Sequence, residues 1–156
     1  MDITQLETLI ENNQLEEIVA LLSQKPSLAT QLTSHQISPM LLACYYKKMD
    51  IANAIVEFMP ELSIFDACAV GKFDDVTLLV FKNPKIVNEY SVDGFTPLGL
   101  ACYFGHEEIA RFLVLKGAEV NLPSKNGFNV FPIHSAVASN NYNIAKMLLS
   151  PCDAIL

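Results

Sequence analysis

A recurring spacing constrains the fold of this chain more than any other feature of its sequence. Five positions of the chain are equivalent in this pattern: Asn13, Lys47, Gly71, Gly105 and Asn140. The steps from each of them to the next are 34, 24, 34 and 35 residues. Apolar residues follow each of them at the same two offsets: Ile18 and Leu21, Ala52 and Ile55, Val76 and Leu79, Ala110 and Leu113, Ala145 and Leu148. Such a period is typical of stacked repeats that share one interior. We therefore predict a single domain over residues 1–156 with five repeats, near residues 1–36, 37–61, 62–93, 94–127 and 128–156.

A longer duplication supports this repeat. The first two repeats align with the third and fourth at a constant offset of 58 residues. The aligned pairs include Pro26 and Pro84, Pro39 and Pro97, Cys44 and Cys102, Tyr45 and Tyr103, and Tyr46 and Phe104. The chain therefore reads as a duplicated pair of repeats followed by a fifth repeat.

Each repeat is predicted to be a pair of short helices, which makes the fold class all-α. The first helices are expected near residues 3–12, 39–46, 63–70, 97–104 and 132–139, and the second helices are expected to begin near Leu15, Met49, Phe73, Glu107 and Tyr142. Three of the first helices open with proline, which fits the first turn because its missing N–H is harmless there. Ser38 and Thr96 precede two of these prolines as N-caps, and Gly117 suits a C-terminal cap.

The fourth repeat carries the most specific motifs. Residues 93–101 read DGFTPLGLA, residues 105–109 read GHEEI, and residues 117–121 read GAEVN. In this order they resemble the ankyrin repeat, although Gly99 stands where that repeat usually has histidine. The resemblance covers the whole chain, less closely in the other repeats. It implies a solenoid of helix-turn-helix units with short β-hairpin fingers, and a protein-binding function.

The fingers are expected near residues 25–37, 83–95 and 118–130, the last with about two extra residues. Only residues 59–62 lie between the second helix of the second repeat and the third repeat. This link is too short for a finger, so we expect a gap in the row of fingers after the second repeat.

Composition and charge narrow the class of partner. Hydrophobic residues make up 51% of the chain and charged residues 17%, so a disordered chain is not expected. The net charge of −7 disfavours nucleic acid and anionic membranes as partners. No apolar run reaches the roughly 20 residues of a membrane span, and the N-terminus has no signal-peptide pattern. We expect a cytoplasmic, monomeric protein that binds another protein.

The residues that could carry chemistry all have structural interpretations. Cys44, Cys68 and Cys102 share one repeat position that faces the stack, so we expect buried thiols; no spacing argument assigns a role to Cys152. The acidic pairs at residues 16–17, 74–75 and 107–108 each open a second helix, where the helix dipole favours carboxylates. His106 and His134 fall where the ankyrin repeat has structural hydrogen-bonding histidines. We therefore predict no catalytic residue, no metal ligand and no cofactor.

The candidate binding residues follow from the resemblance. In ankyrin proteins the last two residues of each first helix and the adjoining fingers form the concave face that binds partners. The corresponding residues here are Tyr45, Tyr46, Val92, Asp93, Phe95, Tyr103 and Phe104. Exposed Tyr and Phe side chains often form interface hot spots. The alternative is that these rings pack against the neighbouring repeat or finger.

Two functions remain open at this point. The first is an intracellular adaptor or scaffold that binds a protein on its concave face. The second is a dedicated inhibitor or immunity-type regulatory protein of one enzyme or toxin. An enzyme would need converging titratable groups in a polar pocket, and the sequence gives no sign of them.

Overall fold

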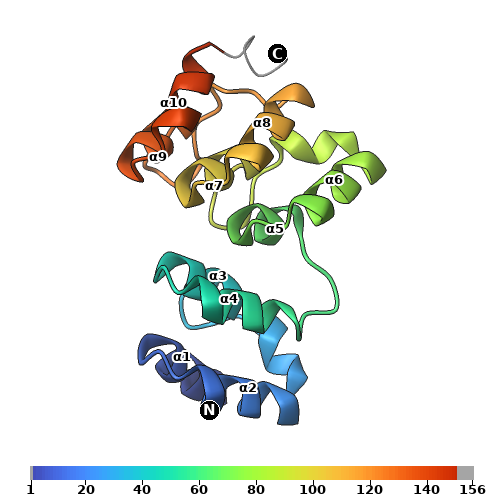
Figure 1. Cartoon of the computed structure of the whole chain (residues 1–156), viewed down its shortest axis with the longest axis vertical. Coiled ribbons are helices and arrows are strands. Elements are labelled where there is room, and N and C mark those ends of the chain that lie inside the picture. Colours follow the sequence, from blue (N-terminus) through green and yellow to red (C-terminus); the bar gives the residue numbers. More distant parts are fainter. Residues whose placement is uncertain (1, 151–156) are drawn as a thin grey trace. The chain divides into compact units, whose positions relative to one another are not determined.

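The computed structural model describes residues 2–150 and is all-helical, which confirms the predicted fold class (Figure 1). Over these residues it contains ten α-helices, two short 3-10 helices and no β-strand. The chain divides into two compact units, Met1–Leu62 and Ser63–Leu156. We call them unit one and unit two and describe each by itself. The division coincides with the end of the short link at residues 59–62.

Unit one contains the first two repeats, and unit two contains the other three. The elements of unit one are α1 (Asp2–Glu11), α2 (Leu15–Gln24), a 3-10 helix (Pro26–Thr30), α3 (Pro39–Tyr45) and α4 (Met49–Val56). The elements of unit two are α5 (Ile64–Val70), α6 (Phe73–Lys82), a 3-10 helix (Pro84–Asn88), α7 (Pro97–Phe104), α8 (Glu107–Leu115), α9 (Pro132–Ala138) and α10 (Tyr142–Leu149). All five second helices begin at the residues that the sequence predicts. No helix over residues 2–150 is both long enough and apolar enough to cross a membrane.

The turn between the two helices has the same backbone conformation in all five repeats. A residue with positive φ ends the first helix each time, and it is one of the five positions that the periodicity identified. Their φ values are 58° at Asn13, 60° at Lys47, 87° at Gly71, 81° at Gly105 and 61° at Asn140. This left-handed conformation is a common way to end a helix because it reverses the chain and satisfies terminal carbonyls.

Side-chain caps start three of the first helices. The Oγ of Ser38 accepts a hydrogen bond from the N–H of Leu41 at 3.1 Å, and Thr96 accepts one from the N–H of Gly99 at 3.0 Å. Ser63 caps α5 in the same way, a role that the sequence analysis did not assign. Pro39 and Pro97 follow two of these caps in the first turn, as predicted.

The core lies between the first and second helices of each unit. Cys44, Cys68 and Cys102 are fully buried, as predicted. Val137 occupies the same repeat position in α9 but is 51% exposed, since no repeat follows it within the described residues. Cys152 lies outside the described residues. In α2 and α6 the second predicted core leucine is half-buried, and the next residue, Leu22 or Val80, is buried more deeply.

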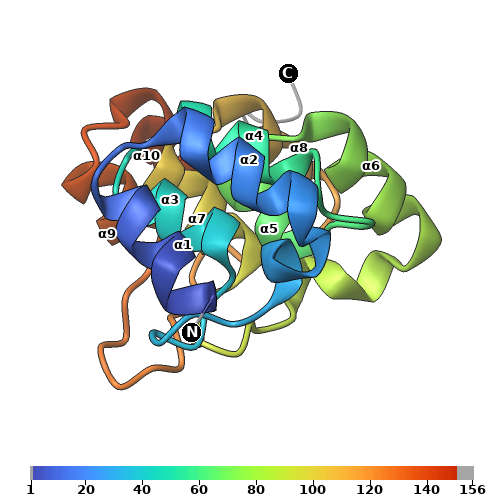
Figure 2. The same cartoon turned by 90° about the horizontal axis from the view of Figure 1, so that it is seen from below.

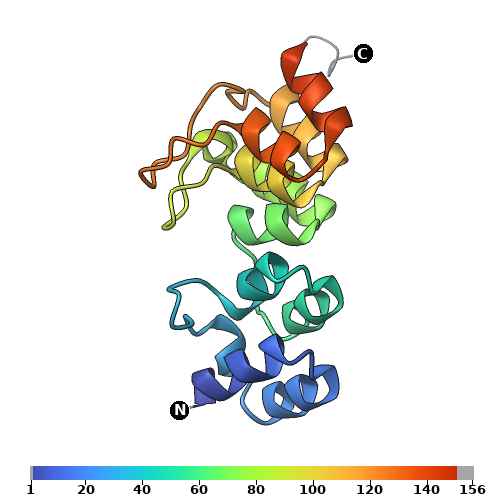
Figure 3. The ribbon, with the colours of Figure 1, turned by 90° about the vertical axis from the view of Figure 1, so that its left-hand side faces the viewer.

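The three fingers are loops with tight turns, and none of them contains a β-strand among the described residues (Figure 3). In the first two fingers a backbone bond closes the turn, from the N–H of Gln36 to the carbonyl of Thr33 at 2.9 Å and from Gly94 to Ser91 at 3.0 Å. Each of the three fingers also has one backbone hydrogen bond across its base. These bonds join the N–H of Thr33 to the carbonyl of Ile37 at 2.9 Å, Ser91 to Phe95 at 2.8 Å, and Ser124 to Val130 at 2.8 Å. The 3-10 helices that begin at Pro26 and Pro84 form the first part of the first two fingers and were not predicted.

Within each unit, side chains link a repeat to the one before it. The linking residue always comes directly after the left-handed position, and it binds a backbone carbonyl near the end of the preceding first helix. The links are Lys48 Nζ to the carbonyls of Ile10 and Glu11 (2.7 and 2.6 Å), His106 Nε2 to that of Ala69 (2.9 Å), and Asn141 Nδ2 to that of Cys102 (2.9 Å). These bonds add directional contacts to the apolar burial that holds stacked repeats together.

Candidate functional site

Two fingers of unit two are bonded to each other. They comprise residues 83–95 and 118–130, and they leave the helices on the same side (Figures 2 and 3). The backbone N–H of Lys125 donates to the carbonyl of Gly94 at 2.8 Å, and the Tyr90 hydroxyl donates to the carbonyl of Pro123 at 2.8 Å. The Lys125 ammonium lies 4.4 Å from the centroid of the Tyr90 ring. Because these contacts join the two loops, the finger side of unit two presents a preorganised surface.

A third connection joins the bases of the same fingers. Asn88 accepts a hydrogen bond from the N–H of Glu119 at 2.9 Å and donates one to the carbonyl of Gly117 at 3.1 Å. Gly117 has a φ of 97° and ends the turn after α8, as the sequence predicts. The Asn88 amide thus forms hydrogen bonds with two backbone groups at the start of the second of these fingers.

The finger residues named from the sequence lie at the turn of the first of these loops. Val92 is 98% exposed, and Asp93 and Phe95 are half-buried. The Asp93 carboxylate accepts a hydrogen bond from the Ser91 hydroxyl, whose oxygen accepts one from the N–H of Phe95 at 3.1 Å. Asp93 therefore shapes the turn, while Val92 points its whole side chain at solvent.

Tyr103 and Phe104 lie at the end of α7, next to the left-handed Gly105. Their ring centroids are 5.0 Å apart and the ring planes are nearly perpendicular, an edge-to-face contact. Tyr103 is 38% exposed, and Phe104 is half-buried. Tyr103 is thus partly exposed while its ring contacts the adjacent Phe104.

Tyr45 and Tyr46 occupy the equivalent place at the end of α3 in unit one. Tyr45 is half-buried, and Tyr46 is 39% exposed. Tyr46, Glu11 and Lys48 line a hollow of about 340 Å³, and the Lys48 ammonium lies 5.8 Å from the centroid of the Tyr46 ring. Because Lys48 is also bonded to two carbonyls of α1, it fixes one side of this hollow.

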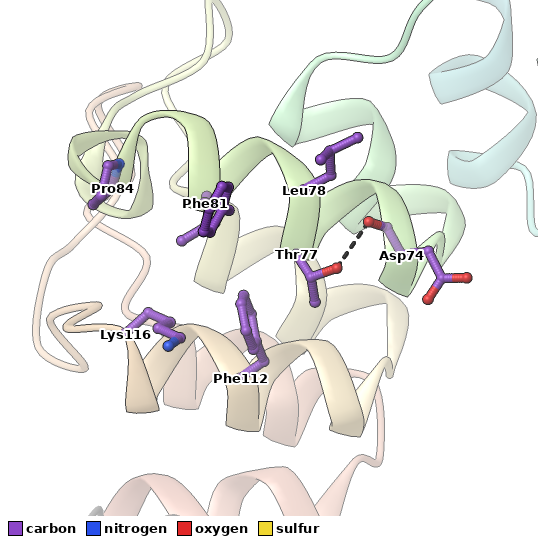
Figure 4. A pocket seen from close by; sticks show the side chains of 8 residues that line it. Asp74, Thr77, Leu78, Phe81, Pro84, Phe112 and Lys116 are labelled. Atoms are coloured by element: carbon purple, nitrogen blue, oxygen red, sulfur yellow. Dashed lines mark hydrogen bonds between the residues drawn. The ribbon is translucent and has the colours of Figure 1, made fainter.

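An apolar groove between α6 and α8 of unit two was not predicted from the sequence (Figure 4). This α6–α8 groove has a volume of about 740 Å³. Phe81 on α6 is 84% exposed and Leu78 is 52% exposed. The lining residues are Asp74, Thr77, Leu78, Val80, Phe81, Pro84, Phe112 and Lys116.

A comparison of the two halves of the duplication was the signal that could have revealed this groove. At the offset of 58, Leu78, Phe81 and Phe112 align with Ala20, Ser23 and Ala54. The outer face of the second helices thus carries small side chains in unit one and bulky side chains in unit two. A purely structural feature of the repeat would be expected in both.

The acidic, histidine and cysteine side chains considered above for catalysis or metal binding lie in helix first turns, at a helix cap or in the core. The acidic residues 16–17, 74–75 and 107–108 occupy first turns of second helices, as predicted. His134 Nδ1 accepts a hydrogen bond from the N–H of Phe131 at 3.2 Å, which caps α9. Burial raises the pKa of the Cys68 thiol far above its ordinary value and that of Cys102 to about 12. In the part of the chain described, no three His, Cys, Asp or Glu side chains are grouped so that they could hold a metal ion.

The sequence is similar to those of known repeat proteins. Residues 64–155 match the family model for ankyrin repeats (3 copies). The chain is 34% identical over 86 residues to ankyrin repeat and SAM domain-containing protein 6 of Rattus norvegicus, covering 55% of this chain and 10% of that protein. It is 35% identical over 97 residues to serine/threonine-protein kinase TNNI3K of Mus musculus, covering 54% of this chain and 12% of that protein.

A third relative is similar over more of the chain. The probable 26S proteasome regulatory subunit p28 of Saccharomyces cerevisiae is 26% identical over 149 residues, which cover 87% of this chain and 64% of that protein. The chain spans only about a tenth of the length of the first two relatives. Ankyrin repeats generally mediate protein–protein interactions. With a family match over more than half of its length, five helix pairs and five equivalent left-handed turns, the chain belongs to the ankyrin-repeat family.

Proposed function

We propose that this chain is a protein-interaction module, an intracellular adaptor or scaffold, whose partner binds the finger side of unit two. The observation that carries this proposal is the bonded pair of fingers, which holds Val92 at an exposed turn. Preorganised loops lose little conformational entropy on binding. Val92, Asp93, Phe95, Tyr103 and Phe104 form the proposed contact, with Val92 and Tyr103 as its exposed apolar anchors.

Tyr45 and Tyr46 are proposed as a second contact region on unit one. The hollow beside Tyr46 has an acidic side chain, Glu11, and a basic one, Lys48, next to an aromatic ring. Such a combination suits a polar or charged side chain of a partner. We keep this region separate from the finger side of unit two, and each is tested by its own substitution.

The test uses capture of a protein partner from the native cell, identified by mass spectrometry, followed by titration calorimetry with the purified partner. Val92→Glu and Tyr103→Ala should each weaken binding by about tenfold or more, since central apolar anchors typically contribute at this level. Tyr46→Ala tests unit one in the same assay. Phe81→Glu, which changes an exposed ring in the α6–α8 groove, is the matched control and should leave the affinity unchanged.

Unchanged affinity for both Val92→Glu and Tyr103→Ala would refute the proposed contact. Far-UV circular dichroism must show the same helical signal for every variant. Because Val92 is 98% exposed, its substitution changes the surface and leaves the core intact.

A second candidate is a dedicated regulatory protein of one enzyme or toxin. The similarity over 87% of the chain to a protein named as a probable regulatory subunit favours it. The two candidates differ in the number of partners. One tightly bound partner at fixed stoichiometry supports the regulatory protein, whereas several partners that compete for the same face support the adaptor.

A further inference from the structure

The α6–α8 groove has apolar walls and oppositely charged ends. Phe81 from α6 and Phe112 from α8 lie on facing sides of it (Figure 4). Asp74 lies at one end, at the start of α6, and Lys116 lies at the other, just after α8. The first turns of both helices carry acidic residues, Asp74 and Asp75 on α6 and Glu107 and Glu108 on α8. The groove is therefore negative at the end where the helices begin and positive where they end.

This polarity suits a third helix that runs antiparallel to α6 and α8. Helices commonly have acidic residues in the first turn and basic residues in the last, which complements their dipole. An antiparallel helix would place its acidic start beside Lys116 and its basic end beside Asp74. It would also need bulky apolar side chains three or four residues apart on one face to fill the space beside Phe112.

Helix α6 itself has all of these properties. It has acidic residues in its first turn and Lys82 in its last. Asp74, Leu78 and Phe81 follow a spacing of four and three residues, which places them on one face. That face is exposed, with Leu78 at 52% and Phe81 at 84%. The helix and the groove that it borders are thus complementary in charge and in apolar character.

We propose that the groove is a self-association surface, occupied by α6 of a second copy of this chain. The two α6 helices lie antiparallel about a twofold axis, so that each contact occurs twice. Phe81 of each copy packs beside Phe112 of the other, and Asp74 of each copy faces Lys116 of the other. The repeat itself does not require these side chains, because unit one has Ala20, Ser23 and Ala54 at the aligned positions.

The proposal departs from the monomer expected from the sequence and does not rest on the proposed partner-binding face. A contact of one helix with one groove is small, so we expect a reversible dimer with a dissociation constant on the order of 10 µM.

Sedimentation equilibrium of the full chain tests the proposal. From about 1 to about 300 µM the average mass should rise from one chain toward two, a range chosen to bracket the expected dissociation constant. Phe81→Glu should weaken dimerisation at least tenfold, because it puts a carboxylate in an apolar contact. Val92→Glu, at a site on the finger side that is even more exposed than Phe81, should dimerise like the wild type. A monomer at every concentration, or a dimer that Phe81→Glu leaves intact, would overturn the proposal.

A charge exchange tests the antiparallel arrangement. Asp74→Lys alone brings two pairs of like positive charges together in the dimer, and Lys116→Asp alone brings together two pairs of negative charges. Each should dimerise several-fold more weakly than the wild type, but a mixture of the two should form a heterodimer of near wild-type affinity, since both pairs become opposite again. A mixture no stronger than either variant would refute this arrangement.

Discussion

The first two repeats and the next two have the same backbone but reach it with different residues. At the offset of 58, α2 aligns with α6, the two 3-10 helices align with each other, and α3 and α7 begin at aligned prolines. The left-handed positions also align, yet unit one has Asn13, Gln36 and Lys47 where unit two has Gly71, Gly94 and Gly105. Non-glycine residues in this conformation typically cost about 1 kcal/mol each. The two units therefore use different residue types at the same left-handed backbone positions.

The glycines of unit two make room for the next repeat. A Cβ atom on Gly71 would lie 2.7 Å from the His106 ring, and one on Gly105 would lie 2.8 Å from the Asn141 side chain. His106 and Asn141 are the residues that bond back to the preceding repeat. In unit one the same link is made by the long side chain of Lys48, which reaches the carbonyl of Ile10 with Asn13 at the turn. A short linking side chain needs glycine beside it, whereas a long one does not.

The largest expected effect concerns the two thiols buried in neighbouring repeats of unit two. Burial raises the pKa of Cys68 and Cys102 above the ordinary value of 9.0. Below pH 9 both thiols are protonated in the folded and unfolded chains, and the full stability is present. As the pH rises above 9 toward 12, the unfolded chain loses these protons first, so stability is lost. At pH 10 the free energy of unfolding should be lower by about 3 kcal/mol than at pH 7 because of these two groups.

Urea denaturation followed by far-UV circular dichroism measures this loss. A Cys68→Ala, Cys102→Ala double variant is the control, because alanine fills the same small position without a titrating proton. The difference between the two proteins isolates the contribution of the thiols from every other effect of pH. The same pH dependence in both proteins would contradict the expected role of the thiols.

An intermediate effect should separate the two kinds of turn. Gly105→Ala should lower the free energy of unfolding by about 2 kcal/mol, because the new Cβ is strained at positive φ and displaces the Asn141 side chain from its hydrogen bond. Lys47→Ala is the matched substitution in unit one. It should change stability by no more than about 0.5 kcal/mol, since a Cβ is already present there.

Hydrogen exchange by mass spectrometry can localise the loss in Gly105→Ala to the α7 and α9 segments. Equal losses for the Gly105 and Lys47 variants would mean that the turns of the two units are equivalent after all.

The smallest expected effect is a gain in stability. Lys47→Gly should raise the free energy of unfolding by about 0.5 kcal/mol, because relief of the left-handed strain slightly exceeds the added entropy of glycine in the unfolded chain. Precise urea midpoints of the wild type and the variant measure it. A loss of stability would show that the Lys47 side chain makes a favourable contact that offsets its backbone strain.

The helices and turns could be predicted because they depend on local signals that recur. Proline in the first turn, with Ser38 and Thr96 as caps, indicated where first helices begin. Apolar residues at fixed offsets indicated the second helices. The fingers were less predictable: their sequences gave the turns, but whether strands pair depends on backbone bonds between segments. The 3-10 helices at Pro26 and Pro84 were missed because a short helix has too few residues to show a period.

For the candidate binding residues, the sequence predicted their positions in the repeat but not the exposure of their side chains. Their repeat offsets placed Tyr46 and Tyr103 at the ends of first helices, where the structure has them. Their exposed fractions depend on neighbours such as Lys48 and Phe104, which the spacing does not place. The α6–α8 groove went unnoticed because the repeat was used to find what the units share, and the groove is made of residues in which they differ.

The sequence by itself determined that this chain is built of five helix pairs with equivalent turns, because caps, prolines and periodic apolar residues act within a few positions of one another. Only the tertiary structure decided which side chains meet across repeats: Asn141 with the carbonyl of Cys102, Lys125 with the finger at Gly94, and Phe81 across a groove from Phe112. Those contacts join residues that are about 30 or more positions apart, and their geometry is set by how neighbouring helices pack, which no single repeat encodes.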